Sequence, residues 1–142
     1  MKAICTGVLL ALVLCTAMVA KTDEKNVPAK VVSALTSKYP KAHHVKWDKE
    51  KGNKYEATFR DADRKHSILF EADGTIVETE VSIPVEELPE TVRQYVAKNY
   101  RSQNITEAAK ITDIAGVVTY EAEVGGKDLL FDVSGNPLPG SR

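Results

Sequence analysis

The fold is decided by KYEATF at residues 54–59, which returns as TYEAEV at residues 119–124. A short segment opening on proline precedes each copy, at Pro28 and again at Pro89. The two prolines lie 61 residues apart (89 − 28), and the two Tyr-Glu-Ala motifs lie 65 residues apart (120 − 55). A repeat of this period indicates two copies of one supersecondary unit.

The segment after each proline has the spacing of an amphipathic helix. Proline suits the first helical position, because its missing N–H would have no partner there. Pro40 stops the first helix, since the residue before a proline avoids helical angles. The apolar residues that recur at intervals of three or four are Val31, Leu35 and Tyr39 in the first copy and Val92, Val96 and Tyr100 in the second.

After each helix the apolar period changes to two, which is typical of antiparallel strands with one buried face. Asp73-Gly74 predicts a two-residue hairpin, and Gly125-Gly126 predicts a turn tighter than the one at residues 61–63. Pro137-Leu138-Pro139 cuts the last strand short, leaving a blunted edge strand or a tail. Strands are predicted from residue 43 to residue 83 in the first copy and over residues 105–114, 117–124 and 127–133 in the second.

These patterns predict an α+β fold in which two tandem helix-plus-antiparallel-strand repeats form one continuous curved sheet with the helices packed on one face. The repeats are expected at residues 27–83 and 88–138, within one domain over residues 27–138. One repeat of about 60 residues would be marginal alone. We therefore expect the two halves to share a core. Ala57 and Ala122 are the small residues expected beneath the helices.

The N-terminal and C-terminal segments have sequence patterns that differ from those of the repeats. Residues 1–20 have the pattern of a signal peptide, with charge returning abruptly at Lys21. The alternatives are a retained membrane-spanning helix, for which the stretch is short, and a lipid anchor at Cys15. Both cysteines lie inside this segment, so its removal excludes disulfides. Residues 21–26 are expected to be a flexible leader and residues 139–142 a tail.

The charge and composition of the chain exclude some classes of binding partner. The formal net charge is −1, and no basic stripe with interleaved aromatics is present, so nucleic acid is not expected as a partner. Once a signal peptide is cleaved, no membrane span is expected. The location expected is therefore periplasmic or secreted.

No motif for a phosphate loop, a zinc protease or a serine nucleophile is present, so we expect no enzyme and no cofactor. His43 and His44 should point to opposite faces of a strand and therefore cannot chelate one ion together. Asp61-Ala62-Asp63 resembles the start of a calcium loop but lacks its glycine and distal glutamate, so no metal is expected. Glu56 and Glu121 are candidates for a hydrolase pair, although such residues are usually surface charges.

The doubled plan of a proline-initiated helix, Tyr-Glu-Ala strands, an apolar pair and a glycine turn resembles the PepSY-like, beta-lactamase-inhibitor-like family of secreted bacterial proteins. The resemblance covers about residues 27–138. It implies one helix and an antiparallel sheet per repeat, joined into a curved sheet, and a periplasmic or outer-surface location. It implies no agreed activity, because fold alone does not define function.

The remaining candidate site is the polar sheet face away from the helices. It could also be simply the solvated side of a sheet. We expect an inhibitor-like, non-enzymatic module that engages a protein or peptide partner through this face. The alternative is a periplasmic small-ligand-binding or envelope-stress sensor protein. The expected partner-binding residues are Lys46, Glu56, Thr58 and Arg60 from the first repeat and Thr119, Glu121 and Glu123 from the second.

Overall fold

The computed structural model describes residues 20–139. Its main elements are two ten-residue helices and eight strands. The order is β1 (Ala20–Thr22), η1 (Glu24–Asn26), α1 (Ala29–Lys38), β2 (His43–Glu50), β3 (Lys54–Asp61), β4 (Arg64–Phe70), β5 (Ile76–Ser82), η2 (Val85–Glu87), α2 (Glu90–Asn99), β6 (Ile105–Asp113), β7 (Val118–Val124) and β8 (Lys127–Asp132).

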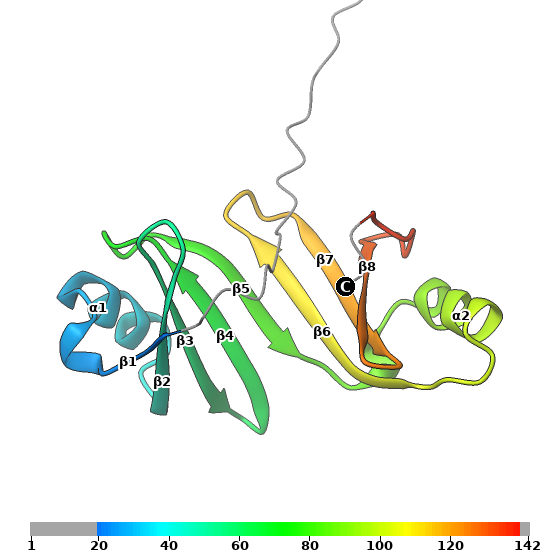
Figure 1. Cartoon of the computed structure of the whole chain (residues 1–142), viewed down its shortest axis with the longest axis horizontal. Coiled ribbons are helices and arrows are strands. Elements are labelled where there is room, and N and C mark those ends of the chain that lie inside the picture. The colour runs from blue at the N-terminus through cyan, green and yellow to red at the C-terminus, as the bar shows by residue number, and fades with distance from the viewer. Residues whose placement is uncertain (1–19, 140–142) are drawn as a thin grey trace, which may run out of the picture.

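All eight strands form one antiparallel sheet in which each strand pairs with its neighbour in the sequence. The two repeats join where β5 pairs with β6, from Glu78 opposite Asp113 to Ser82 opposite Ala109. Figure 1 shows β5 and β6 side by side in the middle, with α1 and α2 at opposite ends of the molecule. The predicted α+β fold with one continuous sheet is confirmed.

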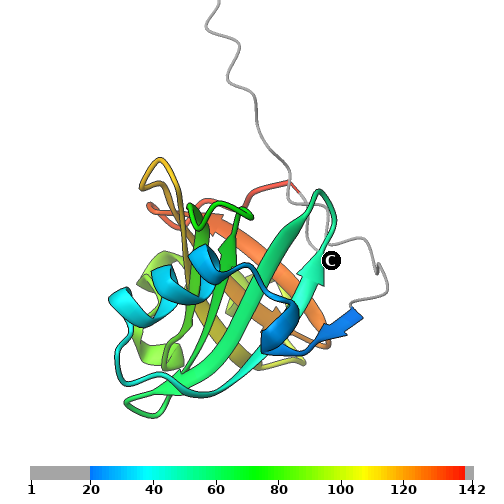
Figure 2. The ribbon, with the colours of Figure 1, turned by 90° about the vertical axis from the view of Figure 1, so that its left-hand side faces the viewer.

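Both helices pack on the same face of this sheet. Residues directly opposite each other in an antiparallel pair share a face. Phe59 lies in the apolar cluster under α1 and Phe131 in the cluster under α2. One row of opposed residues connects them across six strands: Phe59, His66, Val81, Lys110, Tyr120 and Phe131. Figure 2 shows α1 lying across the strands of the first repeat. We call the other side of the sheet the open face.

Each helix begins one residue later than predicted. Pro28 and Pro89 are extended at ψ 135° and 140°, and they cap the helices from outside rather than occupying their first turn. Val31 and Leu35 are buried beneath α1, as the apolar spacing requires. Tyr39 ends the helix just before Pro40 and donates its N–H to the carbonyl oxygen of Leu35.

The prediction of a shared core is wrong. The buried side chains of the two repeats form two clusters, one under each helix, on one continuous sheet. Trp47 and Phe70 lie in the first cluster, and Val124 and Phe131 lie in the second. The reason lies at the seam, where the row of opposed residues passes through the exposed Lys110. The repeats are therefore joined by strand pairing rather than by a common apolar interior.

The predicted flexible leader at residues 21–26 contains ordered elements instead. Strand β1 pairs Thr22 with Trp47 at the edge of the sheet, and η1 follows at once. Val27 then enters the first cluster at 7% exposure. Residues 1–19 of the predicted signal peptide, including Cys15, and residues 140–142 of the predicted tail lie outside the described residues.

The turns also differ from the sequence prediction. The loop at Asp73-Gly74 has three residues, since Gly74 donates its N–H to Glu71 and Glu71 donates to Thr75. The same pattern recurs around Gly116 and Gly135. The β3–β4 and β7–β8 turns both contain two residues at positive φ, so neither is tighter. Pro137 bridges Phe131, which makes the proline segment a short cover on the edge of β8.

Candidate functional site

All seven residues predicted to bind a partner lie on the open face, but they form two separate sets. Lys46 on β2 is opposite Thr58 on β3, whereas Glu121 on β7 is opposite Ala109 on β6. Four strand steps separate β3 from β7, or about 19 Å along the sheet. Glu56 and Glu121 are therefore too far apart for a hydrolytic carboxylate pair, which needs a separation below about 10 Å.

The strands between the two sets contribute open-face residues that the sequence analysis missed. Ser67 lies opposite Glu80, which in turn lies opposite Ile111. Alternation along each strand was the available signal for these positions. Alternation alone does not decide which residues of β5 lie on the open face. Their side depends on a bulge after Leu69 and on the pairing of β5 with β6 across a long connection.

The first set is tied into local hydrogen bonds. Ser67 Oγ donates to Glu56 Oε1, one strand away. Arg60 Nη2 donates to the carbonyl oxygen of Asp63 at 2.6 Å, so this guanidinium supports the β3–β4 turn. Basic side chains nevertheless mix with acidic ones on this half of the open face. The basic residues at open-face positions of β2–β4 are Lys46, Lys54, Arg60 and Lys65.

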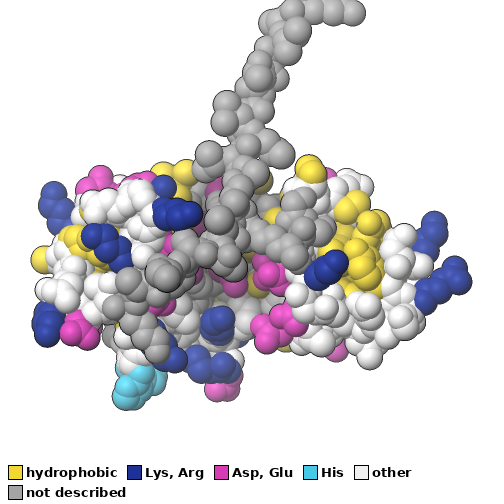
Figure 3. Space-filling view, viewed as in Figure 1, with side chains coloured by type: hydrophobic (Ala, Val, Ile, Leu, Met, Phe, Trp, Pro, Cys, Tyr) yellow, Lys and Arg dark blue, Asp and Glu magenta, His cyan; other side chains and the backbone are white. Residues whose placement is uncertain are grey.

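Glu80 lies at the centre of the open face. Burial raises the pKa of its carboxyl group, and the negative charges of Glu56, Asp128 and Glu107 raise it further. Lys65 acts in the opposite direction. Figure 3 shows a group of acidic side chains just right of the centre of the molecule.

Glu123 of the second set belongs to an acidic row. Glu107 is directly opposite Glu123, and Glu123 is directly opposite Asp128, so three neighbouring strands carry a carboxylate at one level. Thr106 Oγ1 donates to Glu123 Oε1 at 2.8 Å. Asp132 is not part of this row, because its carboxylate accepts hydrogen bonds within the turn that follows β8. These hydrogen bonds, from the Asn136 side chain and from backbone N–H groups, lower its pKa.

The two adjacent histidines do not point to opposite faces, which corrects the sequence prediction. Their ring centroids are 5.3 Å apart at an interplanar angle of 71°. His44 adopts φ +52° beside an irregularity in the β2–β3 pairing, so the simple alternation of a strand fails there. His43 Nδ1 lies 3.0 Å from the carbonyl oxygen of Lys41. His66 lies apart, stacked on Phe59 on the helix face, and burial lowers its pKa.

Across residues 20–139, no group of three or more His, Cys, Asp or Glu side chains converges as a metal site would require. Asp61 ends β3, and Asp63 lies in the exposed two-residue turn that follows it. The acidic row of β6–β8 is likewise spread along the sheet rather than gathered around one point.

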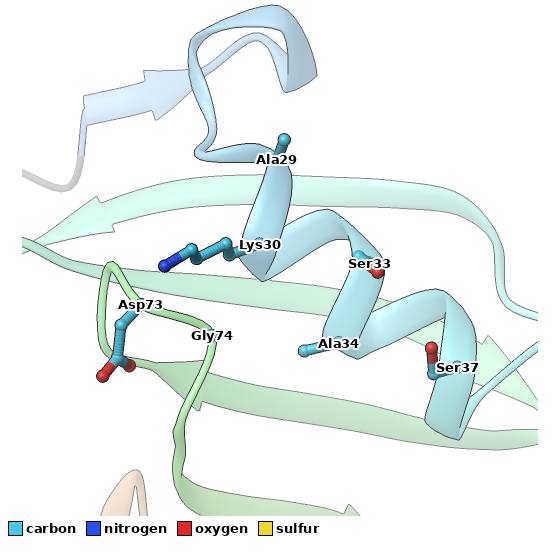
Figure 4. A pocket seen from close by; sticks show the side chains of 7 residues that line it. All are labelled: Ala29, Lys30, Ser33, Ala34, Ser37, Asp73 and Gly74. Atoms are coloured by element: carbon cyan, nitrogen blue, oxygen red, sulfur yellow. The ribbon is translucent and has the colours of Figure 1, made fainter.

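Two grooves in the described part of the chain lie beside α1. One groove of 480 Å³ runs between the helix and the loop before β5. Figure 4 shows Lys30 reaching toward the loop that carries Asp73. Asp73 Oδ1 accepts a hydrogen bond from the N–H of Thr75 at 2.9 Å, which lowers its pKa. A second groove of 560 Å³ lies between η1 and α1.

The repeat and the one-sided helices define a class of protein. The family described as "Putative beta-lactamase-inhibitor-like, PepSY-like" matches residues 16–77 and 53–138, and the chain belongs to this family. The resemblance expected from the doubled motifs is thereby confirmed. No curated protein matches the sequence.

Solved structures share the fold. A protein from Bacteroides eggerthii, described as a "putative periplasmic" protein, has 20% identity and a TM-score of 0.74 over 82% of this chain and 88% of its own. A DUF2874 family protein from Bacteroides uniformis has 22% identity and a TM-score of 0.70, covering 81% of this chain and 88% of its own. A BLIP-like protein from Bacteroides fragilis has 23% identity and a TM-score of 0.62, covering 80% and 83%.

Helices α1 and α2 are short. In the described part of the chain, no helix has the length and apolar character needed to cross a membrane.

Proposed function

We propose that this chain is an exported, non-enzymatic binding module that engages a protein or peptide partner, in the manner of an inhibitor, through its open face. One observation carries the proposal: both helices pack on the same side of an eight-stranded sheet, so a broad polar face is left uncovered by them. The seven residues expected to bind a partner are all at positions on that face.

Export is supported from two directions. Residues 1–20 have the pattern of a signal peptide. The similar protein from Bacteroides eggerthii is described as periplasmic. A periplasmic or secreted location follows if the segment is cleaved, and attachment of a lipid at Cys15 would keep the protein at a membrane surface.

A protein or peptide partner fits the geometry better than a small ligand. Small-molecule sites are concave and enclose most of their ligand. The two grooves beside α1 are open and lined by short or solvated side chains such as Ser33, Ser37 and Asp73. The wide separation of Glu56 from Glu121 supports a non-enzymatic role. A periplasmic ligand sensor is the alternative.

A photo-crosslinking amino acid introduced on each side of the sheet tests the proposal. Thr119 lies on the open face of β7, and the exposed Ala97 lies on α2. In cells that produce the full chain, crosslinking from Thr119 should yield one discrete adduct with a protein, whereas crosslinking from Ala97 should not. Equal adducts from both positions, or none from Thr119, would contradict the proposal. Thermal shifts with a metabolite library would then favour the sensor.

A further inference from the structure

The open face has a different charge in its two halves. On β2–β4 both basic and acidic side chains occupy open-face positions. Strands β5–β8, all within the described chain, have only two basic residues, and the pairing of Lys110 with Tyr120 and of Lys127 with Val124 places both on the helix side. The open-face carboxylates of this half, apart from Asp113 and Asp132 in their turns, are Glu78, Glu80, Glu107, Glu121, Glu123 and Asp128.

This arrangement has a cost in the free chain. Like charges directly opposite each other in a sheet are destabilising. Glu123 faces a carboxylate on both sides, Glu107 on β6 and Asp128 on β8. Positive charge placed over the row would relieve this repulsion. A single metal ion is poorly suited, because the carboxylates do not converge on one point.

Apolar residues lie beside the acidic row. The open-face positions near it hold Ile111 and Leu130, which are half-buried and so present part of their apolar surface. At the end of β6 and β7, the hairpin side chains Ile114 and Val117 are 68% and 58% exposed. The surface therefore offers a narrow apolar strip bordered by negative charge.

We propose that the β5–β8 half of the open face docks an extended, cationic segment of a protein partner, with Lys or Arg side chains over the acidic row and an apolar side chain against Ile111 and Leu130. The inference rests on the proposed function and specifies its partner by charge complementarity. A segment in extended conformation points every second side chain to the same face, so a basic and an apolar residue two positions apart can both contact the sheet.

A pair of synthetic peptides tests this inference on the full chain. One peptide of about eight residues, Lys-Ser-Lys-Ser-Val-Ser-Lys-Ser, places three Lys and one Val on the same face when extended, and its counterpart has Glu in place of each Lys. The parent chain should bind the cationic peptide, more weakly as salt rises, and should not bind the anionic one. The triple variant Glu107→Gln, Glu123→Gln, Asp128→Asn should lose about tenfold or more in affinity, because three exposed pairs are removed.

A matched variant controls for the change in net charge. Glu24→Gln, Asp63→Asn and Glu86→Gln neutralise three exposed carboxylates outside β5–β8 and should leave the affinity unchanged. The melting temperature checks that both triple variants fold. The inference is overturned if the parent chain binds neither peptide, binds both equally, or binds the cationic peptide as tightly after the first triple substitution.

Other occupants of the face would give different results. Saturable binding of Ca²⁺ alone that the triple variant abolishes would identify a metal site, and a dimer that the same variant dissociates would identify a second copy of the chain; either result overturns the inference. Its failure is distinguishable from failure of the proposed function. If the Thr119 crosslink persists in the triple variant, only the inference of a cationic partner segment is wrong. If the parent chain gives no Thr119 crosslink at all, the proposed function is wrong.

Discussion

Ala57 and Ala122 lie beneath the two helices, and both are fully buried in their apolar clusters. Enlarging a side chain in a well-packed core forces the structure to shift, at a cost of about 1–3 kcal/mol. Ala57→Leu and Ala122→Leu should each lower the melting temperature by several degrees. Ala97→Leu on the exposed side of α2 is the control. Unchanged thermal melts for both core variants would show that the helices do not pack closely here.

Ala62 has the backbone of a glycine. It adopts φ +48° in the two-residue β3–β4 turn, where the equivalent turn of the second repeat has Gly125 and Gly126. Positive φ costs a residue with a Cβ roughly 1–2 kcal/mol. Ala62→Gly should therefore stabilise the chain by about 0.5–1 kcal/mol in urea titrations, after the larger entropy of glycine in the unfolded chain is subtracted.

Ala115→Gly provides the comparison for that turn. Ala115 lies in a loop but not at positive φ, so glycine there gains nothing and increases the entropy of the unfolded chain. We expect a small loss of stability. A gain at Ala115 equal to that at Ala62 would mean that backbone strain is not the cause.

Glu80 makes stability depend on pH. Burial is the main cause that raises the pKa of its carboxyl group in the folded state. The folded chain then holds the proton at pH values where the unfolded chain has lost it, so this group lowers stability as pH rises from the ordinary carboxyl pKa of about 4.3. Glu80→Gln should raise the melting temperature at pH 7, and the gain should vanish below about pH 4.

Glu86→Gln, at an exposed position on η2, should leave the melting temperature unchanged at both pH values. A Glu80→Gln variant that is less stable than the parent at pH 7 would instead assign the carboxylate a net favourable contact. Lys65 is the group that could provide it.

The hairpin loop before β5 docks on helix α1. A Cβ on Gly74 would lie 2.7 Å from the carbonyl oxygen of Lys30, and its φ is +92°. Gly116 has φ +79° in a loop of the same hydrogen-bond pattern, with open space around it. Gly74→Ala should therefore destabilise the chain more than Gly116→Ala, which costs only the backbone strain of about 1 kcal/mol. Equal losses would mean that the loop moves freely from the helix.

The helices and most strands could be predicted because their periods are local properties. Val31 and Leu35 alone indicate the buried side of α1, and alternation around Ala57 indicates the buried side of β3. Strand β1 could not be predicted, since three residues at Ala20–Thr22 show no usable alternation and owe their order to pairing with β2. The contact between His43 and His44 depends on a bulge, which alternation does not reveal.

The sequence predicts which residues lie on the open face, but it does not predict which of them lie close together. Alternation placed Glu56 and Glu121 on the polar side, yet their distance depends on how many strands lie between them. The acidic row also depends on register: Glu107 meets Glu123 only because the pairing shifts after Ile105. Such information resides in tertiary pairing and not in the spacing of residues along one strand.

The two repeats have separate apolar clusters on one continuous sheet. It is therefore a testable question whether the repeats unfold in one transition. Five residue pairs join β5 to β6, from Glu78–Asp113 to Ser82–Ala109. Either half, of about 60 residues, would bury too little surface to be more than marginal alone. We therefore expect one cooperative transition despite the separate clusters.

Trp47 makes this testable, because it is the only tryptophan and lies in the first cluster at 4% exposure. Leu129→Ala opens a cavity in the second cluster and should cost about 2–5 kcal/mol. If the sheet couples the halves, the denaturation midpoint followed by Trp47 fluorescence falls together with the midpoint followed by circular dichroism. A Trp47 midpoint that stays at the parent value while circular dichroism shows an earlier transition would mean that the repeats unfold separately. The open face would then join two independent units.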